Sequence, residues 1–222
     1  DKLSGSRLYE ELLLTFSETE PVRAIKRLSE YGLLKVIHPN LTFDEKLEAM
    51  LQAIHDTLSW FDLLFLEERY HKGTIYLMAL LSVLNVSERE TAFTRLSSPS
   101  KMKDTINKGI LKSQELIRQL PLKDLAMIYK AMYPLDIETI IVSMALTVDD
   151  AKKKEISQYL IELRTVKAQL TGNDLKSMGI APGPVYSEII DALLSERLRG
   201  RLKSRDDEKA FVRDHYKAIT HY

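Results

Sequence analysis

The sequence has no cysteine among its 222 residues. This absence excludes disulfide bonds, thiolate zinc sites and a thiol nucleophile. The sequence also lacks any run of about 18 apolar residues, so a membrane-spanning helix is not expected. Its first residues show no signal-peptide pattern. We therefore expect a cytoplasmic protein without a membrane partner.

Alternating apolar and polar residues flanked by hairpin turns are missing as well, so no sheet is expected. No internal repeat of about 34 or 40 residues is present, which argues against a solenoid. Apolar residues recur instead at steps of three and four, the spacing of one helix face. This spacing predicts an all-α fold of about 10 helices.

The longest apolar stripe predicts a helix over residues 43–66. Thr42 with Glu45 forms a capping-box pattern at its start. The residues of the stripe are Leu47, Met50, Leu51, Ile54, Leu58, Phe61 and Phe65.

Three further helices have recognisable ends. Ser87 with Glu90 indicates the start of a helix near residues 88–96. Pro21 suits the first turn of a helix that Tyr31 and Gly32 close. A third helix carries an apolar face from residue 156 to residue 170, with Asp149 as its cap and Gly172 as its stop.

The formal net charge is zero, but the charges are unevenly distributed along the chain. Residues 1–150 contain 18 Lys and Arg against 22 Asp and Glu. Residues 151–222 contain 14 against 10. An acidic first part followed by a basic second part is a charge distribution found in nucleic-acid-binding proteins. An ordinary solvated helical surface explains the charges equally well.

A glycine- and proline-rich turn lies within the basic part, between Thr171 and Tyr186. Gly172 and Gly179 each stand where a helix should stop, because glycine adopts the left-handed conformation at little cost. Pro184 suits the start of the next helix. Exposed N–H groups at such a helix start favour a phosphate. A simple connection between two packed helices is the competing interpretation.

A run of alternating cations follows this turn. Arg197 and Arg199 fall in the last turn of the predicted helix, and Gly200 should end it. Beyond Gly200 we expect extended chain, in which alternate residues point to the same side. The three cations that would share that side are Arg201, Lys203 and Arg205.

The glycine-rich motif resembles a known family. Residues 172–184 read Gly-Asn-Asp-Leu-Lys-Ser-Met-Gly-Ile-Ala-Pro-Gly-Pro, and residues 189–194 read Ile-Ile-Asp-Ala-Leu-Leu. Together with Leu-Arg-Gly at 198–200, they are similar to the tail of bacterial class II tRNA nucleotidyltransferases and poly(A) polymerases. These enzymes add CCA, or A alone, to RNA 3′ ends.

Other parts of the chain agree with this resemblance. Residues 6–12 and 31–39 look like the end of the family's neck domain, and residues 76–81 and 134–141 match its helical body more loosely. The resemblance implies that residues 1–39 end the neck, 40–135 form the body and 136–222 form a basic tail.

The family's catalytic motifs are absent from this sequence. Its head requires a Gly-Ser-x-x-Asp-x-Asp motif, because paired carboxylates hold two catalytic metal ions. No Asp-x-Asp occurs here, and the neck motif Glu-Asp-x-x-Arg is missing too. We therefore expect this chain to be inactive alone, with no catalytic residue, no metal and no cofactor. The resemblance implies that a separate head of the parent enzyme uses Mg²⁺ with ATP or CTP.

By resemblance, the body and tail hold the RNA backbone, from the acceptor stem of a tRNA towards its elbow. Such a role depends on phosphate contacts and shape more than on base edges. The sequence predicts no particular oligomeric state. The predicted RNA-binding residues are Arg164, Lys167, Lys176, Gly179, Gly183, Tyr186, Arg197, Arg199, Arg201, Lys203 and Arg205.

Two other functions remain open. The dyad His55-Asp56 occurs in metal phosphohydrolases of the HD type, although the other histidines are not spaced to complete such a site. A helical protein-interaction or dimerisation module would also fit an all-α chain of this size.

Overall fold

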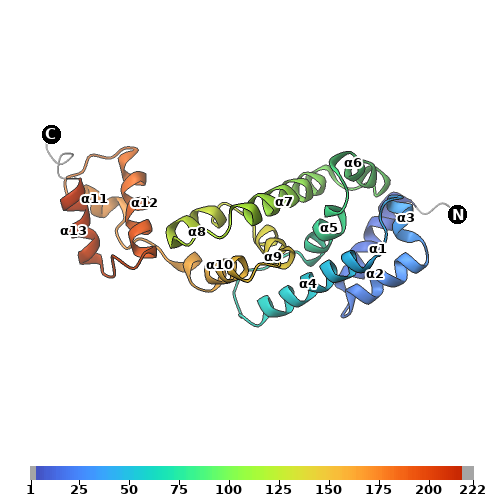
Figure 1. Cartoon of the computed structure of the whole chain (residues 1–222). Helices are drawn as coiled ribbons and strands as arrows, with labels where there is room; N and C mark the ends of the chain where they lie inside the picture. Colours follow the sequence, from blue (N-terminus) through green and yellow to red (C-terminus); the bar gives the residue numbers. More distant parts are fainter. Residues whose placement is uncertain (1–3, 217–222) are drawn as a thin grey trace. The chain divides into compact units, whose positions relative to one another are not determined.

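The computed structural model describes residues 4–216. Within this range the chain forms 13 α-helices and one short 3₁₀ helix, and no strand occurs there (Figure 1). The all-α prediction is confirmed. None of the helices found between residues 4 and 216 has the length and apolarity needed to cross a membrane.

The helices follow one another with short connections. They are α1 Gly5–Ser17, α2 Pro21–Glu30, α3 Leu33–Ile37, α4 Glu45–Asp62, α5 Lys72–Ser82, α6 Val86–Arg95, α7 Ser100–Gln119, α8 Leu125–Met132, α9 Ile137–Leu146, α10 Asp150–Ile161, the 3₁₀ helix η1 Leu163–Thr165, α11 Gly172–Ser177, α12 Val185–Leu198 and α13 Arg205–His215.

The described chain divides into two compact units. The first unit contains residues up to 120 together with 135–153, and the second contains 121–134 together with the residues from 154 onward. One of these limits falls at residue 135, where a boundary was predicted, and none falls at residue 39. The division into neck, body and tail stays a prediction. Residues 121–134 leave the first unit, and the chain then returns to it before entering the second unit again.

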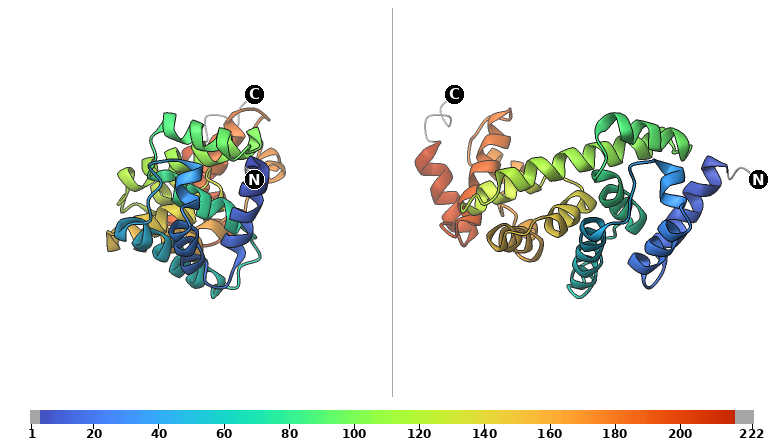
Figure 2. Two further views of the ribbon diagram at one scale, coloured as in Figure 1. Left: turned by 90° about the vertical axis from the view of Figure 1, so that its right-hand side faces the viewer. Right: turned by 45° about the vertical axis from the view of Figure 1, so that its right-hand side comes forward.

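The first unit is built around α4, α5, α7 and α9, which lie next to one another in Figures 1 and 2. The mostly apolar α5 is buried over most of its length. It approaches α7 so closely that a Cβ at Gly109 would clash with Met78. On its other side, Tyr76 of α5 stacks on Phe16 of α1, with ring centroids 5.4 Å apart.

The second unit has a smaller core made by α11, α12 and α13 (Figure 1). Helix α8 packs against α12. The buried apolar residues of this core are Leu170, Leu175, Ile180, Ile189, Leu193 and Val212.

Several predicted helix ends are correct. Helix α2 has Pro21 in its first turn and Tyr31 as its C-cap. Gly32 follows with a φ of +73°, a conformation that favours glycine. Asp149 accepts a hydrogen bond from the N–H of Ala151 at 2.9 Å, which fits its predicted capping role at α10.

The predicted helix 43–66 is too long at both ends. Its N-cap is Asp44, whose carboxylate accepts the Leu47 N–H at 2.8 Å, rather than Thr42. The helix ends at Asp62. Phe65 is not part of the apolar stripe, because it lies in the following loop with 87% of its surface exposed.

Two further boundaries are corrections. The capping box of α6 is formed by Asn85 and Glu88 instead of Ser87 and Glu90. The helix predicted to reach Leu170 ends at Ile161, where the 3₁₀ turn and then non-helical chain take over. The apolar spacing continues past the break, because residues on both sides of it face the interior.

Candidate nucleic-acid interface

The predicted turn between Thr171 and Tyr186 begins with a helix start. The Asp174 carboxylate accepts hydrogen bonds from the Thr171 N–H at 2.8 Å and from its hydroxyl at 2.9 Å. Gly172 is therefore the first residue of α11 and not the stop of a preceding helix. A Cβ at Gly172 would stand 3.3 Å from the Tyr186 ring, so the site suits a residue without a side chain.

Gly179 ends α11 as predicted. Its φ is +85°, and its N–H donates to the Lys176 carbonyl at 3.0 Å. The Ile180 N–H donates to the Leu175 carbonyl at 3.1 Å. These two bonds form a Schellman motif, which closes the C-terminus of a helix.

The start of α12 offers fewer free donors than a phosphate cradle needs. Pro182 and Pro184 have no N–H. The N–H of Tyr186 donates to the Gly183 carbonyl at 3.0 Å, and that of Ser187 donates to the Pro184 carbonyl at 3.1 Å. Gly183 is exposed, with no other atom near its Cβ position. The turn is thus accessible, but the N–H groups of Tyr186 and Ser187 are already used.

Tyr186 packs between the two helices. Its hydroxyl donates to the Ile180 carbonyl at 2.9 Å, and its ring lies against Gly172. The side chain is half-buried and joins the apolar core of the second unit. The structure therefore gives Tyr186 a role in packing α11 against α12.

Arg197 forms an ion pair with a fully buried carboxylate. Its Nη1 lies 3.1 Å from Glu208, whose side chain has no exposed surface. Glu208 also accepts the N–H groups of Gln169 at 3.0 Å and Leu170 at 2.8 Å. A carboxylate buried in this way needs all of its partners. Arg197 consequently serves to join α12, α13 and the segment before α11.

Arg199 is held by two carboxylates within the second unit. Its Nε and Nη2 donate to Asp124 at 2.9 and 3.2 Å, and its Nη1 donates to Glu196 at 2.9 Å. The hydrogen bond from Arg199 is the main cause that lowers the pKa of Asp124. Arg201 shares Glu196, at 3.0 Å. These contacts clamp α8 to the end of α12, and they occupy donors that an RNA phosphate would need.

Arg205 is not in extended chain as predicted, because it is the first residue of α13. Its guanidinium forms an ion pair with Asp174 of α11. Hydrogen bonds from Thr171, followed by the one from Arg205, lower the pKa of Asp174. The predicted row of three cations is therefore interrupted, since Lys203 precedes the helix and Arg205 belongs to it.

The predicted lysines differ from the predicted arginines of the tail in their ion pairing within residues 4–216. Lys167, Lys176 and Lys203 are exposed, and none has an ion pair with the acidic residues in the described part of the chain. Arg164 is half-buried, and this burial lowers its pKa. The interactions between α11, α13 and the chain before α11 bring the three lysines to neighbouring segments of the second unit.

A second basic element was missed by the sequence analysis. Helix α2 carries Arg23, Lys26 and Arg27, at the three- and four-residue steps that place side chains on one face. That spacing is visible in the sequence and indicates a basic helix face.

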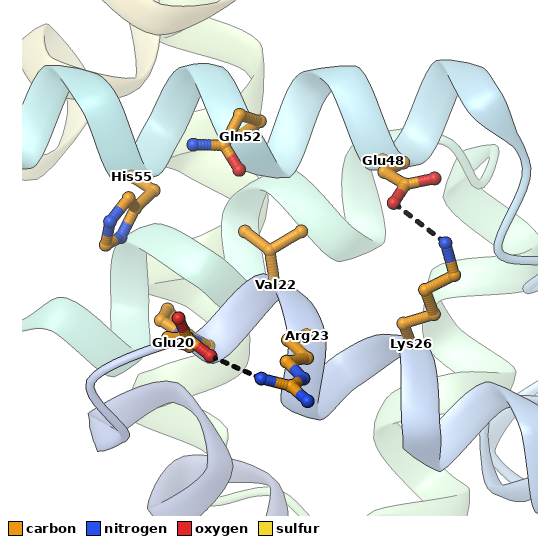
Figure 3. Close-up of a pocket in the computed structure, with 8 residues that line it drawn as sticks. Glu20, Val22, Arg23, Lys26, Glu48, Gln52 and His55 are labelled. Carbon is orange, nitrogen blue, oxygen red and sulfur yellow. Dashed lines mark hydrogen bonds and ion pairs between the residues drawn. The ribbon is translucent and has the colours of Figure 1, made fainter.

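A groove of about 540 Å³ runs between α2 and α4 in the first unit (Figure 3). Lys26 pairs with Glu48 across it at 3.1 Å, and Arg23 pairs with Glu20, the N-cap of α2, at 3.2 Å. Both pairs are well exposed to solvent. His55 and Gln52 line the α4 side.

No group of three or more His, Asp or Glu side chains suited to a metal ion occurs in residues 4–216. His55 faces the groove beside cationic residues of α2. The structure thus offers no support for an HD-type hydrolase.

Comparison with known proteins gives matches that include both α2 and the second unit. A family model described as "Probable RNA and SrmB- binding site of polymerase A" matches residues 1–44. An A-adding tRNA nucleotidyltransferase of Geobacter sulfurreducens is 35% identical over 215 residues, covering 94% of this chain and 24% of that protein. One from Aquifex aeolicus is 27% identical over 192 residues, covering 86% of this chain and 23% of that protein.

The fold is also found among solved structures. A Thermotoga maritima CCA-adding enzyme in complex with tRNA matches 95% of this chain and 52% of its own, with a TM-score of 0.75 and 18% identity. The chain thus spans about a quarter of the length of the two sequence relatives. The two A-adding relatives cover 94% and 86% of this chain, which confirms the resemblance read from its glycine-rich motif.

Proposed function

We propose that this chain, whose sequence and fold match a region of tRNA nucleotidyltransferases, holds the backbone of a tRNA for an enzyme that adds nucleotides to its 3′ end. The observation that carries the proposal is the 35% identity to an A-adding enzyme over nearly the whole chain. The exposed basic residues of both units supply a physical means of holding RNA.

The second unit contributes accessible cations on a rigid support. Lys167, Lys176 and Lys203 project from segments that Glu208 and Asp174 fix in place. Such contacts position a nucleic acid without reading its sequence. This arrangement suits a partner that is recognised by shape, as an A-form stem is.

The first unit contributes α2, which lies within the residues matched by the RNA-binding family model. Its Arg23 and Lys26 pair with exposed carboxylates. Exposed pairs of this kind stabilise a fold only weakly. A phosphate can therefore replace Glu20 or Glu48 as a partner at little cost in stability.

We propose that catalysis belongs to residues outside this sequence. The sequence has no Asp-x-Asp, and the described residues include no metal-binding group. The proposed enzyme would bind Mg²⁺ and ATP or CTP elsewhere in a longer cytoplasmic protein. The chain alone should bind RNA and leave its 3′ end unchanged.

The test is binding of tRNA by the 222-residue chain over a salt series. RNA held through several phosphates gives an affinity that falls linearly with salt on logarithmic axes. A variant with Lys167, Lys176 and Lys203 all changed to Gln should flatten that line. A variant with Lys101, Lys108 and Lys112 of α7 changed to Gln provides a control of equal charge change. If tRNA binding shows no salt dependence, the proposal is wrong.

A protein-binding function is the second candidate. The family model that matches residues 1–44 names a protein as well as RNA. Exposed apolar side chains occur in the same helices, at Leu14, Tyr31 and Val36. Binding of a protein that survives high salt, with no binding of RNA at low salt, would favour this function instead.

A further inference from the structure

Lys123 has an unusual backbone conformation in the loop before α8. Its φ is +62°, in the left-handed region where a residue with a Cβ is strained. Glycine would adopt this conformation more easily. The contacts of the neighbouring residues must therefore hold Lys123 in this conformation.

A buried carboxylate fixes the backbone on one side of the loop. The Lys123 N–H donates to Glu155 Oε1 at 2.7 Å, and the Leu122 N–H donates to Oε2 at 2.8 Å. Glu155 lies on α10 and is buried. Both of its oxygens are thus committed to the loop backbone, and the left-handed conformation is held in place.

Asp124 fixes the loop on the other side. Its Oδ1 accepts the Met127 N–H at 2.9 Å, which caps α8, and its two oxygens bind Arg199. The two acidic side chains that hold this loop, Asp124 and Glu155, are therefore already occupied. Lys123 is exposed and has no ion pair with any acidic residue of the described range.

We propose that Lys123 contacts a phosphate of the RNA held by the second unit, with Glu155 and the Asp124–Arg199 pair as positioning residues. This inference rests on the proposed RNA-binding function. The loop held by Glu155 and Asp124 keeps one exposed cation next to the Asp124–Arg199 pair. A phosphate of a ribose-phosphate backbone offers the anion that such a cation binds. Lys123 is not among the predicted RNA-binding residues, because it lies outside the basic tail.

Variants of Lys123 separate its charge from its backbone conformation. Lys123→Gly should lower the slope of log affinity against log salt by about one, the value for one phosphate contact. The same variant should keep or raise the melting temperature, because the strain is relieved. Lys123→Gln should lower the slope equally, and Lys123→Arg should restore it. Lys101→Gln in α7 is the matched control and should leave the slope unchanged.

Combining Glu155→Gln with Lys123→Gly tests the role of Glu155. Glu155→Gln should weaken tRNA binding when Lys123 is present and have no further effect in the Lys123→Gly background. A non-additive result of this kind shows that the two residues act through one contact. Equal losses in both backgrounds would contradict the positioning role.

The outcomes distinguish this inference from the proposed function. If the unmodified chain binds tRNA and Lys123→Gly and Lys123→Gln leave the salt slope unchanged, the Lys123 contact is wrong and RNA binding stands. If Lys101→Gln lowers the slope as much as Lys123→Gln, the effect is a general one of charge, and the assignment fails. If the unmodified chain shows no salt-dependent binding, both proposals fail together.

Discussion

The two units use their basic residues differently. In the first unit, Arg23 and Lys26 of α2 pair with carboxylates that are about as exposed as they are. In the second unit, Arg197 pairs with the fully buried Glu208, and Arg199 and Arg201 share the largely buried Glu196. Exposed pairs contribute little to stability, whereas breaking a buried pair is costly. Arginine in the second unit is therefore mainly structural, and the exposed lysines are left for a ligand.

The largest effect is expected from Glu208→Ala. It leaves Arg197 without its partner and two backbone N–H groups without an acceptor, so the second unit should lose about 3–5 kcal/mol of stability. Thermal unfolding followed by circular dichroism should show an early transition. Fluorescence of Trp60, which lies in α4 of the first unit, should change little in that transition.

Glu48→Ala in the first unit is the matched control. It breaks the exposed pair with Lys26 and should cost less than about 1 kcal/mol. Equal losses of stability in Glu208→Ala and Glu48→Ala would contradict the difference between the two units.

A fall in pH should destabilise the second unit more than the first. The pKa values of Asp124, Asp174 and Glu196 are all lowered in the folded chain. For Glu196 burial raises the pKa, but hydrogen bonds from Arg201 and Arg199 outweigh it. A lowered pKa adds stability above the unfolded pKa, which is lost as the pH falls through the folded one.

The loss should therefore set in below about pH 4, near the unfolded values of these carboxyl groups. In the first unit the carboxyl groups with a lowered pKa are Glu88 and Glu90. An acid titration that compares circular dichroism with Trp60 fluorescence will show which unit unfolds first. Earlier loss of the Trp60 signal would contradict the expectation.

The smallest change in stability is expected from substitutions of the basic residues of α2. Arg23→Gln and Lys26→Gln should each alter the free energy of unfolding by less than about 1 kcal/mol, because both ion pairs are exposed. Each should nevertheless reduce the salt dependence of tRNA binding by about one phosphate. Unfolding in urea and a binding titration measure the two effects on the same variants. If both variants keep the salt dependence of the unmodified chain, α2 does not contact the RNA.

Local patterns predicted the fold class and several helix ends. The proline of α2 and the glycines at 32, 179 and 200 all lie where backbone preference places them. Such features depend on a few neighbouring residues, so they are visible in the sequence. The apolar spacing continues past the end of α10 through Leu163 and Leu170, both buried, although the chain between them is not α-helical. The predicted helix was therefore too long.

The site was harder to predict, because charge pairing links distant segments. Arg199 and Asp124 lie 75 positions apart, and Arg205 and Asp174 lie 31 apart. Counting cations along the sequence cannot tell which of them a carboxylate already occupies. The basic face of α2 was overlooked for a related reason, since the acidic total of residues 1–150 conceals it.

The placement of α8 has a consequence for how the chain folds during synthesis. Its buried residues Ala126, Ile128 and Met132 belong to the second unit, and its packing partner is α12. The ribosome makes α9, α10, η1 and α11 between them, so α8 must wait on the order of ten seconds for α12 to emerge. During that time its apolar face is available to a chaperone or to α8 of another copy. The contact between α8 and α12 therefore forms only after most of the chain has been made.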